Sequence, residues 1–442
     1  MNITTKNIKR IIYLIITALL LIYSITVIKR YISNLWNKQF IANYLDSARS
    51  TESKLSDGNK NCNCSFLSID LDKSVEDHFD RTIDLILDNK VKLNRIFHFL
   101  FNSKDPYNDI LLPKMEYFPS RITFNNTKLD AKIKLTGGLA DHYNTPRRSL
   151  RIKLNDTILV NMSKFNLYNP TSRAGGIYEW ITDRLMLSHG LISLNSGYLD
   201  VTINNQQKGI YFYQEQPTAK MLEHNKRPLG LLVRLESLKD GDNNSSLSIS
   251  NYYDKKSFSN KQDFVTQQRI LLDKINAFNK NKIGFDKLVS ISKIAKFSAI
   301  IDLTNGYHGG ELRNMYFYLN PSDSLLEPIG REFSTNYYFI GLSKLPPYIF
   351  GFNKFSADNT EYLIKQFDLN TDEVDLFRSS YHKYLEDVSN TDSLNNFFHQ
   401  IDSELSERQF CLFKAEPNLK SFSKEHYAKN QILIREYLLS FE

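Results

Sequence analysis

The sequence is poor in cysteine, which removes the usual basis for a disulfide framework or a zinc site. Three cysteines, Cys62, Cys64 and Cys411, occur in 442 residues. A tetrahedral zinc site needs four ligands, and the Cys62–Cys64 pair alone cannot supply them. We therefore expect no cysteine to carry chemistry. A bond between Cys411 and this pair would require an oxidising compartment.

A strong excess of one charge is also lacking. The net charge is +7, from 56 Lys and Arg against 49 Asp and Glu, and the lysines are spread along the chain. A nucleic-acid-binding protein would concentrate them on one recognisable motif, so we predict no nucleic-acid partner. No internal repeat is present. The 41% hydrophobic content and the length allow one large or two medium globular domains.

Long apolar runs are absent except for one, at residues 11–28, which holds no charged residue. A membrane-spanning helix needs about 20 apolar residues, and Lys9, Arg10, Lys29 and Arg30 flank the run as snorkelling anchors. The run ends without small residues of the A-x-A cleavage type. We predict an uncleaved signal anchor over residues 1–30, a single-pass membrane protein and a globular domain outside the cytoplasm.

The remaining chain predicts an α+β fold. Residues 31–73 are polar and are expected to form a stalk. Residues 74–236 are expected to form mainly strands, among them a hairpin over residues 117–135 that turns at Asn125-Asn126, with helices over about 74–101, 172–189 and 217–224. Residues 237–262 are rich in Ser, Asn and Asp and are expected to form a loop insert. Residues 263–442 are predicted to be mainly helical, with short strands at 315–319 and 325–329.

One predicted strand, residues 150–154, has a polar face. Leu150, Ile152 and Leu154 point to one side, and Arg151 and Lys153 point to the other, because side chains alternate along a strand. Basic residues on one face can contact phosphate or can simply face solvent. In the helix predicted over residues 172–189, Glu179 and Asp183 lie one turn apart.

These segments and their order resemble the CotH family of atypical kinases, and in particular a membrane-anchored bacterial branch of it. The resemblance covers roughly residues 74–332. Its motifs are Gly138 to His142, Ser149-Leu150-Arg151-Ile152-Lys153, Lys164-Phe165-Asn166-Leu167, Pro170 to Arg173, Glu179-Trp180, Gly209-Ile210-Tyr211 through Glu215, Gly230, Gly306-Tyr307-His308 through Asn314, and Leu326-Glu327-Pro328-Ile329-Gly330.

The resemblance implies a protein-kinase-like two-lobe fold, with a sheet-rich N-lobe and a mainly helical C-lobe, that uses ATP with Mg²⁺ or Mn²⁺. It implies the following site residues. Lys153, with Arg151 as runner-up, would contact phosphate, Glu179 would pair with that cation, and Glu215 would lie at the hinge. His142 would bind phosphate or cap its turn, and Asn314 and Glu332 would hold the metal.

The sequence departs from this pattern at several places. His308 and Glu311 are the candidate catalytic residues, but Gly309 stands where an aspartate is expected, and Glu332 stands where the second metal position expects Asp. No G-x-G-x-x-G loop is present. Three functions stay open: phosphoryl transfer to an extracytoplasmic protein or an envelope polymer such as a glycan, a degenerate kinase fold that binds without turnover, and a scaffold for another membrane protein.

Overall fold

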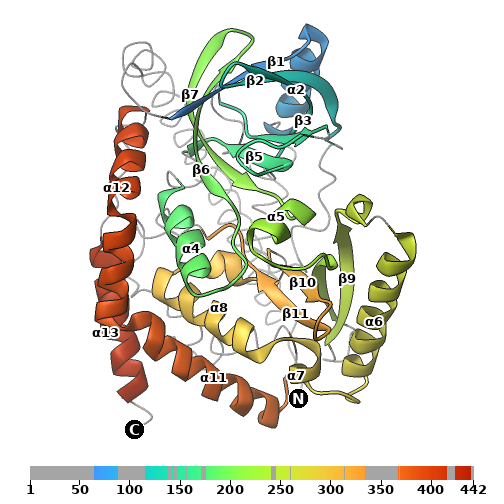
Figure 1. The fold of residues 1–442 in the computed structure, drawn as a ribbon, viewed down its shortest axis with the longest axis vertical. Helices are drawn as coiled ribbons and strands as arrows, with labels where there is room; N and C mark the ends of the chain where they lie inside the picture. The colour runs from blue at the N-terminus through green and yellow to red at the C-terminus, as the bar shows by residue number, and fades with distance from the viewer. Residues whose placement is uncertain are drawn as a thin grey trace, which may run out of the picture.

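The protein folds as a mixed α+β structure with a strand barrel at one end (Figure 1). The computed structural model describes residues 64–87, 115–137, 142, 147–155, 157–170, 176–239, 245–258, 260–312, 314–333, 367, 369–415 and 424–439. A second, smaller sheet and most of the helices lie below the barrel in this view. This arrangement confirms the predicted α+β class, with strands early in the chain and helices late.

Seven strands close the barrel. They are β1 (Ser65–Asp70), β2 (Phe118–Phe124), β3 (Thr127–Leu135), β4 (Leu150–Leu154), β5 (Lys164–Tyr168), β6 (Ser196–Ile203) and β7 (Gln206–Glu215). Their order is β1-β2-β3-β4-β5-β7-β6, and β1 closes the ring by pairing antiparallel with β2 and parallel with β6. Fully buried aliphatic side chains such as Ile133, Ile152 and Leu167 fill the interior.

Asparagine pairs turn the two tightest hairpins, as the sequence predicts. Asn125 and Asn126 between β2 and β3 have φ of 44° and 68°, and Asn204 and Asn205 between β6 and β7 have φ of 49° and 63°. Two-residue hairpin loops favour positive φ at both positions, because that twist matches the flanking strands, and Asn tolerates it better than most residues. The local sequence therefore determines the register of both hairpins.

The predicted stalk over residues 31–73 is wrong in its last part, because β1 lies there and belongs to the barrel. Leu67 and Ile69 of this short strand point into the core. Two alternating apolar residues are too weak a signal to predict a strand among the polar residues around them. Helix α2 (Lys73–Leu87) follows at once, and the carbonyl of Asp72 accepts its first backbone bonds. The rest of the predicted stalk lies outside the described residues.

Helix α4 (Ile177–Ser188) lies between the barrel and the helical region (Figure 1). Tyr178, Ile181 and Leu185 are buried, whereas Leu187 is 46% exposed. Leu187 follows Leu185 by two residues, which places it on the other side of the helix. Glu179 and Asp183 are both buried.

The predicted loop insert over residues 237–262 is also wrong, because most of it forms a β-hairpin and the start of a helix. The second sheet has the order β11-β10-β8-β9, with β8 (Leu232–Lys239), β9 (Ser245–Tyr253), β10 (Tyr316–Asn320) and β11 (Leu325–Ile329). Serines alternate with Leu247 and Ile249 in β9, so composition concealed a period of two. The first sheet region therefore ends before residue 236, because β8 pairs with β10 and not with the barrel.

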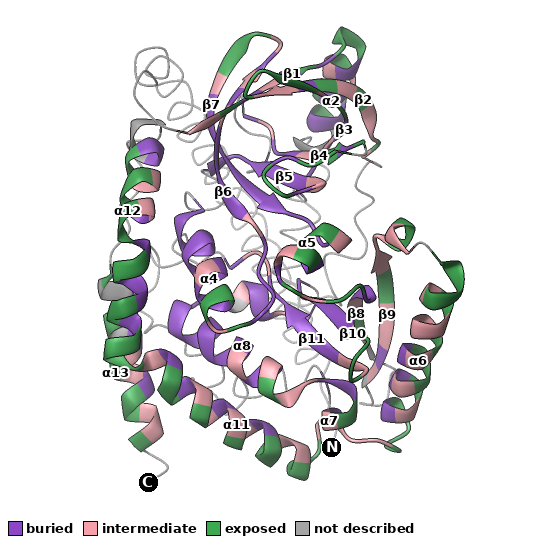
Figure 2. Ribbon diagram, in the orientation of Figure 1, coloured by how far each residue is buried: buried purple, intermediate pink, exposed green. Residues whose placement is uncertain are grey.

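Helices cover this sheet and continue to the end of the described chain. They are α5 (Ala219–His224), α6 (Lys261–Asn279), α7 (Phe285–Leu288), α8 (Ile291–Thr304), α11 (Thr371–Ser389), α12 (Thr391–Ala415) and α13 (Glu425–Leu439), with single 3₁₀ turns η3 (Lys255–Ser257) and η4 (Tyr307–Gly310). Helix α8 is buried on most sides, whereas α11 and α12 expose one face (Figure 2). The segment predicted to cross the membrane lies outside the described residues, and no helix within them is long and apolar enough to span a bilayer.

Two arginines clamp α12 onto α4. Arg184 of α4 donates to Glu404 of α12 at 2.7 Å, and Arg408, one turn further along α12, donates to the same carboxylate. Both guanidinium groups also lie over the Trp180 ring, at 5.5 and 4.7 Å from its centroid. Burial raises the pKa of Glu404, but the two arginines outweigh it and lower that pKa. The clamp therefore favours the ionised carboxylate.

We expect Glu404→Gln to lower the free energy of unfolding by about 0.5–1 kcal/mol at neutral pH, a small loss because the partly exposed pair is screened by solvent. A lowered native pKa adds stability above the unfolded pKa and loses it as the pH falls through the native pKa. The difference from the native protein should thus shrink at about pH 3.5. Urea unfolding at both pH values measures it. Glu407→Gln, which removes an exposed acid from the same helix, is the control, and an equal loss there would argue against the clamp.

Candidate functional site

Five basic side chains gather on the outer face of three adjacent barrel strands. We call Lys132, Lys134, Arg151, Lys153 and Lys164 the cationic face. The strand register aligns them in two rows, Lys132 beside Lys153 beside Lys164, and Lys134 beside Arg151. Their neighbours Ile133, Ile152 and Phe165 are fully buried inside the barrel, so alternation turns all five outward.

The row that holds Arg151 continues into a buried polar seam. Arg151 Nε donates to Asn166 Oδ1 at 2.8 Å, Asn166 lies opposite Gln214 on β7, and Gln214 Nε2 donates to Glu179 Oε2 at 3.2 Å. Asn166, Gln214 and Glu179 are at most 1% exposed. Two amides thus stand between the guanidinium of Arg151 and the helix carboxylate.

The predicted pair of Lys153 and Glu179 is not formed. Lys153 is exposed and lies in the other row, between Lys132 and Lys164, whereas Glu179 is buried beneath α4 next to Gln214. Same-face residues on a strand are about 7 Å apart, so Lys153 lies about that distance from Arg151, which belongs to the row that leads to Glu179. Arg151, the runner-up, is the residue that this row connects to the helix carboxylate.

Glu215 and His142 lie apart from the cationic face. Glu215 is fully buried at the end of β7, where its Oε2 accepts from the Asn195 amide at 3.1 Å and lies 3.3 Å from His224 Nε2. Burial raises the pKa of Glu215 well above its usual value. His142 is 8% exposed, and its Nδ1 lies 2.9 Å from Ser149 Oγ.

The space for His142 depends on Gly137. A Cβ on Gly137 would lie 2.2 Å from His142 Cγ, and Gly137 has a φ of +107°. The imidazole therefore packs against the turn, which fits the turn-capping alternative for His142 better than a phosphate contact.

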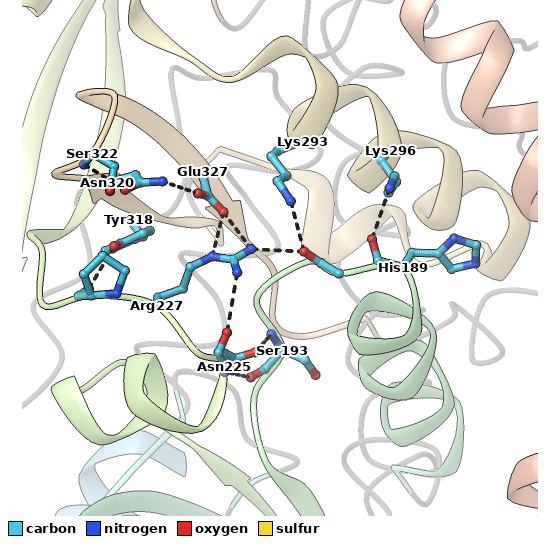
Figure 3. A network of polar contacts seen from close by, with 12 residues as sticks. His189, Ser193, Asn225, Arg227, Lys293, Lys296, Tyr318, Asn320, Ser322 and Glu327 are labelled. Carbon is cyan, nitrogen blue, oxygen red and sulfur yellow. Dashed lines mark hydrogen bonds and ion pairs between the residues drawn. The ribbon is translucent and has the colours of Figure 1, made fainter.

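Helix α4 is held in place at its C-terminal end by a second polar network (Figure 3). Lys293 of α8 donates to the Gly190 carbonyl at 3.1 Å, Lys296 donates to the His189 carbonyl at 3.1 Å, and Arg227 joins the Gly190 carbonyl to Glu327 of β11. Cations at the carbonyl end of a helix are favourable because they face its negative pole. Together with the α12 clamp, this network fixes Glu179 relative to both sheets.

The residues predicted for catalysis and metal binding are brought together in the second part of the molecule. His308 Nδ1 lies 3.8 Å from Glu311 Oε1, and His308 Nε2 lies 3.4 Å from Glu332 Oε2. Asn314 Nδ2 donates to the His308 carbonyl at 2.8 Å. Arg331 completes the group by pairing with Glu332 at 2.8 Å. We call His308, Glu311, Arg331 and Glu332 the ion-pair cluster.

Close packing of two glycines explains why distant segments meet there. A Cβ on Gly309 would lie 2.5 Å from Phe333 Cδ1 and 2.6 Å from the Arg331 carbonyl, and one on Gly330 would lie 2.2 Å from Phe333 Cζ. The turn after β11 can therefore lie directly against η4. Glu332 itself has a φ of 60°, an uncommon conformation for a residue with a side chain.

The carboxylates of the ion-pair cluster favour a protonated His308. Burial lowers the pKa of His308, but hydrogen bonds to Glu311 and Glu332 outweigh it and raise the pKa to about 9. The imidazole is therefore a cation at neutral pH, whereas a general base must be neutral. Two positive groups face two carboxylates. The catalytic role of His308 and Glu311 remains a prediction.

These residues fit a divalent metal poorly. Mg²⁺ and Mn²⁺ prefer free oxygen ligands, but His308 and Arg331 occupy the side chain of Glu332. No group of three or more His, Cys, Asp or Glu residues in the described part of the chain is arranged to hold a metal ion. The arrangement supports ion pairing instead.

A path of contacts connects the cationic face to the ion-pair cluster. Asp254, just after β9, interacts electrostatically with Lys164, and its neighbour Tyr253 packs with ring centroids 4.8 Å from Tyr316. The Arg331 guanidinium lies 5.0 Å from the centroid of the same Tyr316 ring. The end of β9 therefore lies between the two candidate sites.

Residues 133–338 match the CotH kinase protein family. The match includes the cationic face except Lys132, the buried seam, α4 and the whole ion-pair cluster. The matched segment is thus similar to a family described as kinases. A search of curated proteins finds no match for the chain.

Sequence reasoning missed Lys132, Lys134, Lys164 and Arg331. The first two were visible as alternating lysines in the predicted hairpin, but only strand pairing shows that they join Arg151 and Lys153. Arg331 was read as a spacer before Glu332. A basic residue directly next to a presumed metal ligand was the available signal, because it opposes cation binding.

We expect the double variant His308→Ala with Arg331→Ala to lose stability in EDTA and to regain it with Mn²⁺, because Glu311 and Glu332 are then left unneutralised. The melting temperature of the native protein should not change with Mn²⁺. The control His189→Ala removes a histidine that faces a single carboxylate, Asp387, and should gain no metal response. If Mn²⁺ raises the melting temperature of the native protein and Glu332→Gln abolishes this rise, the ion pairs open to bind a metal.

Proposed function

We propose that this chain is a CotH-type kinase-fold protein that binds a nucleotide but does not transfer its phosphoryl group. The observation that carries the proposal is the ion-pair cluster. Phosphoryl transfer by a kinase fold needs carboxylate and amide oxygens that hold metal ions beside the γ-phosphate. Here His308 and Arg331 pair with Glu332, the carboxylate that the family resemblance predicts for that role, and His308 also pairs with Glu311.

Two further observations support binding in the absence of turnover. The family match implies nucleotide use, and the cationic face offers phosphate-binding groups within the matched region. The lysine–glutamate pair that orients the phosphates in kinases is replaced by the indirect row from Arg151 to Glu179. The triphosphate would thus lack both the bound metal ions and the lysine–glutamate pair that position it for transfer in kinases.

A second candidate function is phosphoryl transfer itself, which the family match favours. In this case a metal would have to displace His308 and Arg331 from Glu332. The acceptor would be a protein or an envelope glycan, and the domain would face the outside of the membrane.

Incubation of the full chain with ATP labelled in the γ-phosphate separates the two functions. In EDTA, we expect ATP to raise the melting temperature of the protein. With Mg²⁺ or Mn²⁺ present, we expect the protein to yield no more ADP or labelled protein than a heat-denatured sample. Metal-dependent ADP release that Glu332→Gln abolishes would establish the transferase instead. If ATP does not change the melting temperature, the proposed nucleotide binding is wrong.

The proposed location is outside the cytoplasm, behind the apolar run at residues 11–28. Cys411 of α12 supports it, because this residue is disulfide-bonded and such bonds persist in oxidising compartments. Cys64 retains a thiol, whose pKa is raised to about 11 mainly by burial. The remaining cysteine of the sequence is Cys62, which lies outside the described residues.

We expect non-reducing peptide mapping of the chain purified from membranes to recover Cys411 linked to Cys62. Cys411→Ser should lower the free energy of unfolding by about 2–5 kcal/mol, since the cross-link restricts the unfolded chain. Cys64→Ser, unfolded with denaturant in parallel, is the control and should cost less. Recovery of Cys411 as an alkylatable thiol would contradict both the bond and the location.

A further inference from the structure

The cationic face costs the barrel stability, which suggests that it is kept for a ligand. Lysines directly opposite each other on neighbouring strands repel, and each such pair is destabilising. Lys132, Lys153 and Lys164 form two such contacts in one row, and none of the five cations forms an ion pair with a described carboxylate. Elsewhere on the same barrel, Arg148 pairs with Asp80 of α2.

Two members of the face are not ordinary solvated lysines. Burial is the main cause that lowers the pKa of Lys134, and Arg151 adds to it. Burial together with Arg151, Lys134 and Lys153 lowers the pKa of Lys164 to about 8, although Asp254 opposes the change. Half-buried ammonium groups held next to one another form a preorganised anion site, because their water shell is already partly removed.

The face is compact and bounded. Strands lie about 4.8 Å apart and same-face residues about 7 Å apart, so the three strands and two rows cover roughly 10 by 7 Å. Pro119 borders Lys132 on β2, and Asn166 and Tyr168 continue the outer side of β5 without charge. Asp130 interrupts β3 before the next lysine, Lys128. These limits fit a short chain of phosphates better than an extended polyanion.

Charge neutralisation of such a ligand needs no metal here. Kinase folds normally use divalent ions to offset the charge of the phosphates, but here the Arg331 guanidinium lies 2.8 Å from Glu332, the carboxylate expected to hold such an ion. We propose that the cationic face binds the polyphosphate group of the nucleotide directly, without a divalent cation. This inference rests on the proposed nucleotide binding and names its phosphate subsite. Since Mg²⁺ lowers the charge of ATP, it should weaken the binding, which is the reverse of a metal-dependent kinase.

Calorimetric titration of the full chain with ATP and with inorganic tripolyphosphate tests this. In EDTA both probes should bind, more weakly at high salt, and added Mg²⁺ should weaken ATP. Lys164→Gln and Lys134→Gln should each weaken both probes roughly tenfold, the loss expected for one charge-assisted contact. Both variants should melt no lower than the native protein, because each removes a repelling charge.

Lys128→Gln is the matched control, because Lys128 is an exposed lysine on the same strand and the same face but lies beyond Asp130. It should change either affinity by less than twofold. Tighter binding of ATP with Mg²⁺, or equal effects of Lys164→Gln and Lys128→Gln, would overturn the inference. If ATP binds with the same affinity to the native protein, Lys164→Gln and Lys134→Gln, the inference is wrong but the proposed function is not contradicted. Tripolyphosphate binding that follows the variants, without ATP binding, would support the phosphate subsite and overturn the nucleotide function.

Discussion

The barrel wall where residues 165–168 of β5, 196–199 of β6 and 209–215 of β7 lie together is buried on both sides, and the rest of the structure depends on this. Leu167 and Tyr211 fill the interior, while Phe212 and Tyr198 on the outer side pack in the same core as α4 and α8. Polar groups in such a wall must find partners within the protein. Asn166, Gln214 and Glu179 do so by forming a seam, and this seam sets where the cationic face ends.

The same wall determines how freely α4 can be positioned. Its N-terminal half packs on the barrel, and Arg184 joins it to α12. Lys293, Lys296 and Arg227 bind the carbonyls of His189 and Gly190, which directly follow the helix. The Glu179 carboxylate within the helix accepts a hydrogen bond from the Gln214 side chain, so α4 is held from the barrel, from α8 and from α12.

Charge is distributed in opposite ways on the two sides of β9. Lysines and one arginine that form no ion pair with a described carboxylate line three barrel strands, whereas near η4 Glu332 lies next to His308 and Arg331. Binding of an anion is favoured at the first place and binding of a cation is opposed at the second. A protein that needed a divalent ion would be expected to show the reverse balance at its carboxylates.

Periodicity explains which parts of the fold could be predicted. Alternation located β2, β3 and β4, whereas α4, β10 and β11 were also predicted close to their observed positions. Composition was the less reliable guide, since Ser-rich β9 and the short β1 were both read as irregular chain. For the candidate site, the residues near His308 were found from the motif, but Arg331 and the lysines of β3 and β5 were not.

The sequence by itself determined the face on which each side chain lies, the two asparagine hairpins, and the family resemblance, because these depend on residues close together along the chain. Only the tertiary structure decided which strands are neighbours, and therefore that Arg151 and not Lys153 leads to Glu179. It also decided that Glu332 meets His308, which follows from the packing of Gly309 and Gly330 against Phe333. Alternation along a strand predicts that a side chain points outward. Which groups it then contacts depends on segments that are distant in the sequence.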